Sequence, residues 1–521
     1  MPTSAGSATN AVTDSRPPAG ERAKPGDAIA SRESVSSRES VGGAGWTCSA
    51  GTFTQLLTKR DRPFSWLNPA PIWQSRNDRL ARWLGDPTND RRRAWMAELG
   101  PNGSDLVVDY SQKERISFLV MGDTGEGDAS QYAVVPPLLS RAEDTAFLFI
   151  CSDVIYPAGG IEAYMDRFFR PYAGYPGPIY AVPGNHDWYD DLTGFMFHFC
   201  GVEHRPPVRA GSVQGWIRNL LSSKPQPPDS AAVAEMRALR AAPAQHARQP
   251  APYFAIDAGP LRLVAIDTGI TGVIDRDQGE WLRRVSRETG KPKVLLTGKP
   301  IYVDGEHHAG PIEDDDGTVD EIVLDPKHNY VAAIGGDIHN YQRYPVSLAD
   351  GRTIQYIVSG GGGAFMHATH KIPRVELTGV HERDFRCYPL RGDSLSLYSK
   401  LYDEKLGFGR GKLEIGPDEA AAIMAERLGI EATRSSAQSV TVSDRARRAA
   451  KILLGLLPGR GRGALHLPFS EFFDWNEPPL FKSFLRVDAE PGELRIRCFA
   501  ATGCAAQEQS PPVEDEVRIA L

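Results

Sequence analysis

The sequence of 521 residues lacks the features that mark several large classes of protein. It has no apolar run near the roughly 20 residues that cross a bilayer, so no transmembrane helix is expected. Its first residues contain no apolar segment of the secretory type, so no secretory signal is expected. The six cysteines form no Cys-x-x-Cys pair, which argues against a zinc ribbon or a thioredoxin-like motif. Such scattered cysteines favour reduced thiols and a cytoplasmic location over a disulfide framework.

Two familiar hydrolase motifs are also missing. Without G-x-x-x-x-G-K-[ST] a nucleotide-binding P-loop is unsupported, and without G-x-S-x-G a serine hydrolase is disfavoured. Lys and Arg total 59 against 66 Asp and Glu, which gives a net charge of −7. This balance provides no global attraction for nucleic acid or an anionic membrane. The apolar fraction of 41% and charged fraction of 24% are ordinary for a folded globular protein.

Changes in composition divide the chain into five parts. The first part is rich in Ser, Gly, Ala, Pro and Arg and cannot bury enough apolar surface to fold alone. The predicted parts are a disordered tail at 1–45, a helical or mixed extension at 46–114, a catalytic core at 115–374, a cap or side subdomain at 375–470, and a hairpin at 471–521 that completes the core. Within the core, 205–250 is predicted to be an insertion with one short helix.

The core repeats one pattern, in which a short apolar run is followed by polar residues. The runs include ISFLVMGD, TAFLFICSD, PIYAVPGNHD, PKVLLTGKP and YVAAIGGDIHN. Apolar runs of this length with helices between some of them predict an α/β fold whose sheet is covered on both faces. In such folds ligands gather at the carboxyl ends of the strands.

The polar residues at these strand ends are types that bind metal ions. They are Asp123 in MGDTGEGD, Asp153 in CSDVIYP, Asn185 and His186 in PGNHDWYD, and Asp337 and His339 in GGDIHNYQRY. Carboxylate, imidazole and amide donors together suit Mn, Fe or Zn. A carboxylate shared between two such ions is a known arrangement for phosphoester hydrolysis.

The ordered motifs GD-x-G, SD-x-x-Y, GNHD and GD-x-HNYQR resemble those of the calcineurin-like metallophosphoesterase superfamily. The Tyr of SDVIY and the HNYQRY segment resemble the purple acid phosphatase branch most. The resemblance covers about 115–370 and implies a four-layer α/β/β/α sandwich with a dinuclear centre of Fe, Mn or Zn. It also implies hydrolysis of a phosphorylated small molecule or protein, in which a metal-activated hydroxide attacks phosphorus in line. A phosphomonoester is preferred over a diester.

The resemblance also implies a role for each motif residue. The implied roles are Asp123 and His339 on the first metal, Asp153 as a bridge between both, Tyr156 as the tyrosinate on ferric iron, and Asn185 on the second metal. His186 would lie over the substrate, and Asp187 would orient its ring. Two alternatives stay open: Tyr156 as a packed aromatic, and Asp187 as a helix cap.

Two departures from the family pattern affect the second metal. Gly298 in LLTGKPIY stands where the family has a His, and Asp337 replaces the first His of G-H-x-H. Three explanations stay open. Lys299 could act as a cation that holds the phosphate. A loop histidine could supply the missing nitrogen, from His307, His308, His367 or His370. The second site could be weak or empty.

Several other features allow two interpretations. The glycines of SGGGGAFMHATH could present N–H groups to an anion or form a tight turn. Arg343 could bind phosphate or form a structural ion pair. Asp128 is expected to cap a helix, and the acidic run at 313–317 to be solvated.

A second hypothesis concerns the function of the whole chain. Because Gly298 cannot ligate a metal, the protein could be a degraded phosphoesterase that binds a phospho-ligand or a protein without turnover. The basic amphipathic segment at 444–463 could contact a membrane or an anionic partner, or pack on the protein's own body. No nucleic-acid partner is indicated.

Overall fold

The structure is a computed structural model that describes residues 46–57, 69–100, 106–208, 213–222, 227–406, 409–454 and 477–521. The predicted disordered tail therefore lies outside the described residues. So does the end of the predicted basic segment, from 455 to 463.

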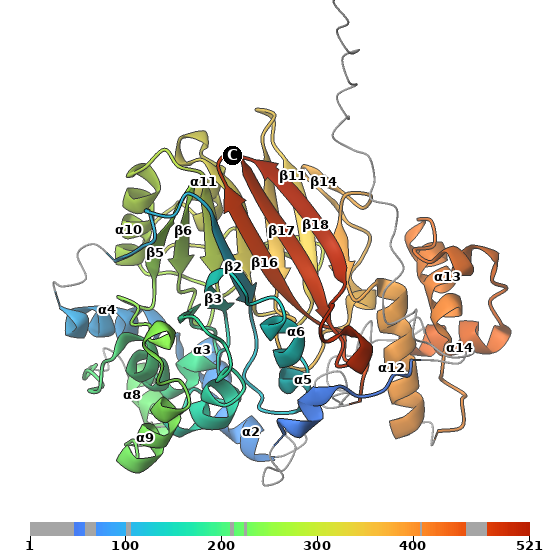
Figure 1. Cartoon of the computed structure of the whole chain (residues 1–521), viewed down its shortest axis with the longest axis horizontal. Coiled ribbons are helices and arrows are strands. Elements are labelled where there is room, and N and C mark those ends of the chain that lie inside the picture. The colour runs from blue at the N-terminus through green and yellow to red at the C-terminus, as the bar shows by residue number, and fades with distance from the viewer. Residues whose placement is uncertain are drawn as a thin grey trace, which may run out of the picture.

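Two β-sheets form the centre of the molecule (Figure 1). The six-stranded sheet has the order β18 (Val513–Ala520), β17 (Glu493–Ala501), β16 (Lys482–Glu490), β2 (Ile116–Met121), β3 (Thr145–Cys151) and β4 (Ile179–Val182). The eight-stranded sheet has the order β1 (Val107–Asp109), β5 (Phe254–Ala258), β6 (Leu261–Ile266), β7 (Lys293–Thr297), β10 (Tyr330–Gly335), β12 (Thr353–Ser359), β11 (Tyr341–Ser347) and β15 (Arg386–Tyr388). Short ribbons join β8 (Tyr302–Val303) to β9 (Glu306–His307), and β13 (Glu376–Leu377) to β14 (Val380–His381).

The strands that lead into the predicted site are parallel neighbours. In one sheet β2, β3 and β4 are parallel, and in the other β6, β7, β10 and β12 are parallel. The sheets face each other across a shared apolar core, in which Phe149 of β3 lies 6.1 Å from Phe254 of β5 between ring centroids. Parallel strands buried on both faces explain the continuous apolar runs in the sequence. The α/β fold class is confirmed.

Helices cover the outer faces of both sheets. The α-helices are α2 (Pro69–Gln74), α3 (Asn77–Leu84), α4 (Thr88–Leu99), α5 (Ala129–Tyr132), α6 (Val135–Leu139), α7 (Thr193–Phe195), α8 (Val213–Leu221), α9 (Ser230–Ala238), α10 (Arg276–Arg287), α11 (Val319–Leu324), α12 (Arg391–Leu406), α13 (Pro417–Leu428) and α14 (Asp444–Leu453). Short 3-10 or π turns lie at Thr52–Gln55, Ile161–Ala163, Met165–Phe169, Asp187–Asp190, Met196–Cys200, Pro243–Gln245, Pro326–His328, Thr369–Lys371, Ser435–Ser439 and Ala505–Gln507. Trp281 and Leu282 of α10 are buried in the core of the eight-stranded sheet, and Leu138 of α6 packs on the other sheet.

The peripheral parts are joined to this core through the sheets. The N-terminal extension provides β1, which pairs with β5, in addition to α2, α3 and α4. The predicted hairpin near the C-terminus is confirmed, because β16 and β17 pair up to Glu490 and Glu493, and β16 also pairs with β2. The described residues of the insertion at 205–250 include two α-helices, α8 and α9, rather than the single helix that was predicted.

Helices α12, α13 and α14 lie together at one side of the molecule (Figure 1, orange). In the described part of the basic segment, the apolar face of α14 is buried, with Ala446, Ala449 and Leu453 in the core. This packing is the one expected of a helix that rests on the protein's own body. The predicted membrane contact stays a prediction.

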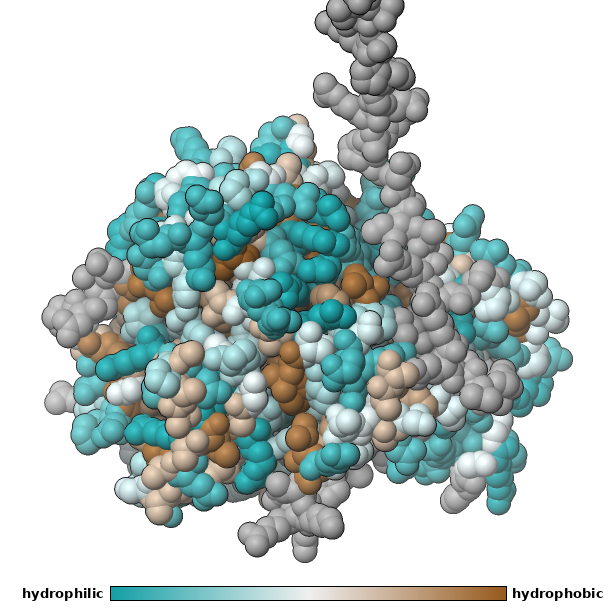
Figure 2. All heavy atoms as spheres, viewed as in Figure 1, coloured by the Kyte–Doolittle hydropathy of each residue, from teal (hydrophilic) through white to brown (hydrophobic). Residues whose placement is uncertain are grey.

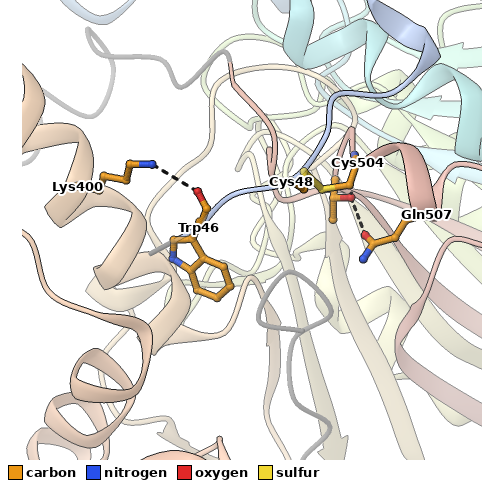
Figure 3. The surroundings of a disulfide bond; sticks show 6 residues. Trp46, Cys48, Lys400, Cys504 and Gln507 are labelled. Atoms are coloured by element: carbon orange, nitrogen blue, oxygen red, sulfur yellow. Dashed lines mark hydrogen bonds between the residues drawn. A yellow bond between two sulfur atoms is a disulfide. The ribbon is translucent and has the colours of Figure 1, made fainter. Parts of the chain in front are cut away.

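A disulfide corrects the expectation of reduced thiols. Cys48 is bonded to Cys504 and ties the chain before Thr52–Gln55 to the turn that follows β17 (Figure 3). Beside it the Lys400 ammonium of α12 donates to the carbonyl of Trp46 at 3.4 Å. Sequence spacing did not reveal the pair because its cysteines are 456 residues apart.

The surface is mostly hydrophilic on the face viewed in Figure 2, with separate apolar patches. The most exposed large apolar side chains include Trp83 of α3, at 77%, and Val213 of α8, at 76%. Within the described ranges, no helix combines the length and apolar character needed to cross a membrane.

Candidate active site

Four charged side chains occupy the same position relative to a strand end. Asp123, Asp153 and Asp337 each come two residues after the last residue of β2, β3 and β10, and Lys299 comes two residues after β7. The three aspartates have left-handed backbone, with φ of 57°, 35° and 67°. Non-glycine residues rarely adopt this conformation, and where they do it often marks a functional site.

The backbone of the two sheets brings these strand ends together. Strands β7 and β10 pair in register at Thr297 and Gly335, so Lys299 and Asp337 lie side by side. Across the two sheets, the backbone N–H of Asp337 donates to Asp123 Oδ1 at 3.1 Å. The predicted convergence of distant residues at one rim is therefore present in the structure.

Tyr156 lies at the centre of the first cluster. Its hydroxyl is 2.9 Å from Asp153 Oδ2, 3.0 Å from His339 Nε2 and 3.3 Å from Asp123 Oδ1. The other ring nitrogen of His339, Nδ1, lies 2.7 Å from the carbonyl of Phe365 and so carries the proton, which leaves Nε2 as an acceptor toward the cluster.

Burial and mutual repulsion shape the charges of this cluster. The pKa of Asp123 is raised by burial and by the neighbouring carboxylates of Asp153 and Asp337. Burial and the carboxylates of Asp153, Asp123 and Glu126 raise the pKa of Tyr156. Burial lowers the pKa of His339. A bound cation would relieve this repulsion and favour the ionised carboxylates.

His186 lies between two tyrosine rings above Asp153. Its ring centroid is 4.4 Å from that of Tyr156 and 4.6 Å from that of Tyr189, and its backbone N–H donates to Asp153 Oδ1 at 2.8 Å. Its ring is positioned through Nδ1, which donates to the carbonyl of Pro157 at 2.9 Å. This contact directs Nε2 away from Pro157.

Asp187 has a different role from the one predicted. Its buried carboxylate accepts the backbone N–H groups of Val154, Ile155 and Gly184 at 3.0–3.2 Å. It therefore ties together the loops that carry Asp153 and Asn185. It neither orients the His186 ring nor caps a helix.

The second half of the site contains an ammonium group. Lys299 Nζ lies 2.6 Å from Asp337 Oδ1, with 26% of the Lys299 side chain exposed. Burial opposes the charge of Lys299, but the carboxylates of Asp337 and Asp153 raise its pKa, so it is an ammonium. Asn185 is held nearby, because its amide N–H donates to the Tyr189 hydroxyl at 2.6 Å.

Gly298 leaves no room for a side chain at the place of the missing histidine. A Cβ there would lie 2.7 Å from Thr268 Oγ1 and 2.9 Å from the carbonyl oxygen of Pro183. Both contacts are far closer than real Cβ contacts. The surrounding structure therefore has no space for the histidine that the family has at position 298.

The loop histidines differ in their distance from the site. His367 stacks on His339 with 4.2 Å between centroids, and its Nδ1 accepts the backbone N–H of His339. His370 is instead hydrogen-bonded to Ser394 of α12. His307 pairs with Asp320. His308 lines a cavity beside Lys299.

The structure also shows the contacts of two features that allowed two interpretations, and of Asp128. The guanidinium of Arg343 is engaged by Asp515 of β18, with a 3.0 Å contact at Nη2, so Arg343 forms a buried ion pair and does not face the site. The backbone N–H of Gly362 donates to the carbonyl of Gly122, so the glycine-rich segment packs tightly on the Asp123 loop. Asp128 caps α5.

Some site residues were missed in the sequence. Tyr189 lies within the GNHDWYD segment but was assigned no role. The extension also reaches the rim, where Ser75 Oγ donates to the carbonyl of Pro157 and Asn77 donates to the carbonyl of Tyr189. The helix that begins at Asn77 has no motif that would connect it to the site.

The donors around Tyr156 can be tested for their fit to a metal ion. Among the described residues, no three His, Cys, Asp or Glu side chains are arranged to hold a metal ion by themselves. Around the first position, however, the donors include the phenol of Tyr156, and no described group donates to the buried Asp123 Oδ2. Oxygen and nitrogen donors 2.9–4.0 Å apart match neighbouring ligands around one ion with bonds near 2.1 Å. The ligand roles themselves stay predictions.

A cavity of about 530 Å³ adjoins the second half of the site. Lys299 and Asp337 form part of its lining, together with Thr268, Ile301 and His308. Its combination of charged and apolar walls is typical of a small-molecule site.

Comparison with known proteins identifies the domain that carries this site. Residues 116–341 match the family model of calcineurin-like phosphoesterases. This stretch is a calcineurin-like phosphoesterase domain. The family hydrolyses phosphoesters and in general uses divalent metal ions.

The solved structures that are similar to this chain are distant. The purple acid phosphatase PPD1 of yellow lupin (Lupinus luteus) is 13% identical with a TM-score of 0.36, over 79% of this chain and 54% of the lupin chain. GAP50, the anchor in the inner membrane complex of Plasmodium, is 11% identical with a TM-score of 0.31, over 53% of this chain and 81% of its own. PhoD is 10% identical with a TM-score of 0.31, over 78% of this chain and 69% of the PhoD chain.

The chain thus matches about half the length of the lupin enzyme, and the purple acid phosphatase branch stays a prediction. A comparison with curated proteins finds no match.

Proposed function

We propose that the protein is a metal-dependent phosphatase that hydrolyses phosphomonoesters by in-line attack without a covalent intermediate. The observation that carries this proposal is the cluster of Asp123, Asp153 and His339 around Tyr156, beside His186, within a phosphoesterase domain. A metal ion held there would supply Lewis acidity and lower the pKa of a water molecule.

The chain's own groups have separate tasks in this proposal. His186, held through Nδ1 by Pro157, protonates the leaving oxygen or stabilises developing charge. The Lys299 ammonium binds a phosphate oxygen by a charge-assisted hydrogen bond. The cavity of about 530 Å³ beside Lys299 accepts the organic group of a phosphorylated small molecule, or a side chain of a phosphorylated protein.

Turnover of p-nitrophenyl phosphate tests the proposal. Metal-stripped protein should be inactive and regain activity with Mn²⁺, and bis-p-nitrophenyl phosphate should be hydrolysed more slowly. Asp153→Asn and His186→Ala should each lower turnover on the order of 100-fold or more. Asp229→Asn, an exposed helix N-cap where Asn serves equally well, is the matched control.

The second candidate is a degraded phosphoesterase that binds a phospho-ligand or a protein. The closed space at Gly298 favours it. Protein that binds no metal and stays inert with Mn²⁺ would support this candidate against the phosphatase. The cytoplasmic location also stays a prediction, and the Cys48–Cys504 disulfide favours an oxidising compartment instead.

A further inference from the structure

We propose that the Lys299 ammonium takes the place of a second metal ion, so that each chain binds one metal ion and the phosphate is held between that ion and Lys299. This inference rests on the proposed phosphatase function and specifies how many metal ions the phosphatase site binds.

The placement of Lys299 supports the assignment. Lys299 follows β7 at the same two-residue offset at which Asp337 follows β10, and the two strands are paired neighbours. Lys299 Nζ contacts Asp337 Oδ1 at 2.6 Å, while the Asp337 backbone N–H contacts Asp123 Oδ1. The positive charge is therefore fixed beside the first cluster by the framework of the sheet.

The backbone around Lys299 is held in place. Thr268 Oγ1 accepts the backbone N–H of Lys299 at 3.0 Å, and Thr297 Oγ1 donates to the Lys299 carbonyl at 3.0 Å. The same Thr268 hydroxyl closes the space above Gly298. The local structure that removes a possible metal ligand also positions the ammonium.

The remaining donors are poorly suited to a second ion. Asp337 is already paired with an ammonium, and a divalent cation on the same carboxylate would be repelled by it. Asp153 Oδ1 accepts the backbone N–H of His186, so one lone pair of this oxygen is already engaged. The residues at this position therefore do not fit the second metal that the family resemblance implies.

Metal stoichiometry of the full-length protein is the first test. Apo protein is saturated with Mn²⁺ or Zn²⁺, freed of unbound metal and measured by elemental analysis. One ion per chain is expected. Two ions per chain would overturn this inference and leave the phosphatase proposal intact, whereas no bound ion would overturn both.

Phosphate affinity is the second test, measured by calorimetry with inorganic phosphate on Mn²⁺-loaded protein. Lys299→Met should bind phosphate on the order of 10- to 100-fold more weakly, because a charge-assisted hydrogen bond is lost. The exposed Lys327→Met is the matched control and should bind as the unmodified protein does. Equal affinity in folded Lys299→Met would refute the role of Lys299. If that variant does not fold, the metal ratio of the unmodified protein still decides the proposal.

Discussion

At the scale of single residues, Tyr156 is the group on which the first cluster is organised. Its one hydroxyl proton faces three acceptors at 2.9–3.3 Å, on Asp123, Asp153 and His339. The hydroxyl lies between groups that would otherwise repel one another. Burial and these carboxylates raise its pKa, so only a cation in contact with the oxygen would favour the tyrosinate.

Asp187 should matter for stability through the loops that it joins. In Asp187→Asn one oxygen becomes an NH₂ group, which cannot accept the backbone N–H groups of Val154, Ile155 and Gly184 as the carboxylate does. The free energy of unfolding should fall by about 1–3 kcal/mol, the cost of a buried donor without a partner. Urea unfolding measures this change, with Asp229→Asn as control. Equal midpoints for the two variants would contradict the role given to Asp187.

The site residues differ in how well the sequence could predict them. Asp123, Asp153, Asp337 and His339 follow apolar strands directly, so their type and position predicted a shared location. The roles of Asp187 and Tyr189 depend on hydrogen bonds to backbone or to a neighbouring amide, which leave no trace in residue spacing.

At the scale of elements, the ends of β2, β3, β7 and β10 position the charged side chains of the site, and the small residue Gly298 limits the space beside them. The apolar runs and the hairpin were predictable because buried strands have a simple pattern. The number of helices in the insertion was not predictable. Composition alone did not indicate that a proline-rich stretch separates two helices, α8 and α9. Helix α9 begins after Pro228, with Asp229 as its N-cap.

Gly298 at the end of β7 should tolerate no larger residue. A Cβ in Gly298→Ala would press on Thr268 Oγ1 and the Pro183 carbonyl, and we expect a loss of about 1–3 kcal/mol in the free energy of unfolding. Gly290→Ala is the control, since a Cβ there meets nothing within 4 Å. Chemical denaturation of both variants measures the difference. If the Gly298→Ala protein were as stable as the Gly290→Ala protein, position 298 would have room for a side chain, and this interpretation of Gly298 would be wrong.

At the scale of the whole molecule, the disulfide connects parts that are distant in the sequence. Cys48 precedes every described helix, and Cys504 follows β17 in the six-stranded sheet. Neither partner could be chosen from the sequence, because six cysteines allow many pairings and no spacing motif distinguishes them.

Breaking this disulfide should destabilise the protein by about 2–4 kcal/mol, as is typical of native disulfides. Cys504→Ser, or dithiothreitol added to the unmodified protein, should lower the melting temperature. Cys387→Ser, which removes an unpaired thiol, is the control. Under denaturing conditions without reductant, four of the six cysteines should react with a thiol reagent. Six reactive thiols, or a melting curve unaffected by reductant, would contradict the pairing.

The Cys48–Cys504 bond also turns most of the polypeptide into a closed covalent ring that contains every candidate catalytic residue. A single cut by a protease in an exposed loop within that ring would leave both fragments attached to each other. Such nicked protein would migrate as one species on a gel until a reductant released the pieces.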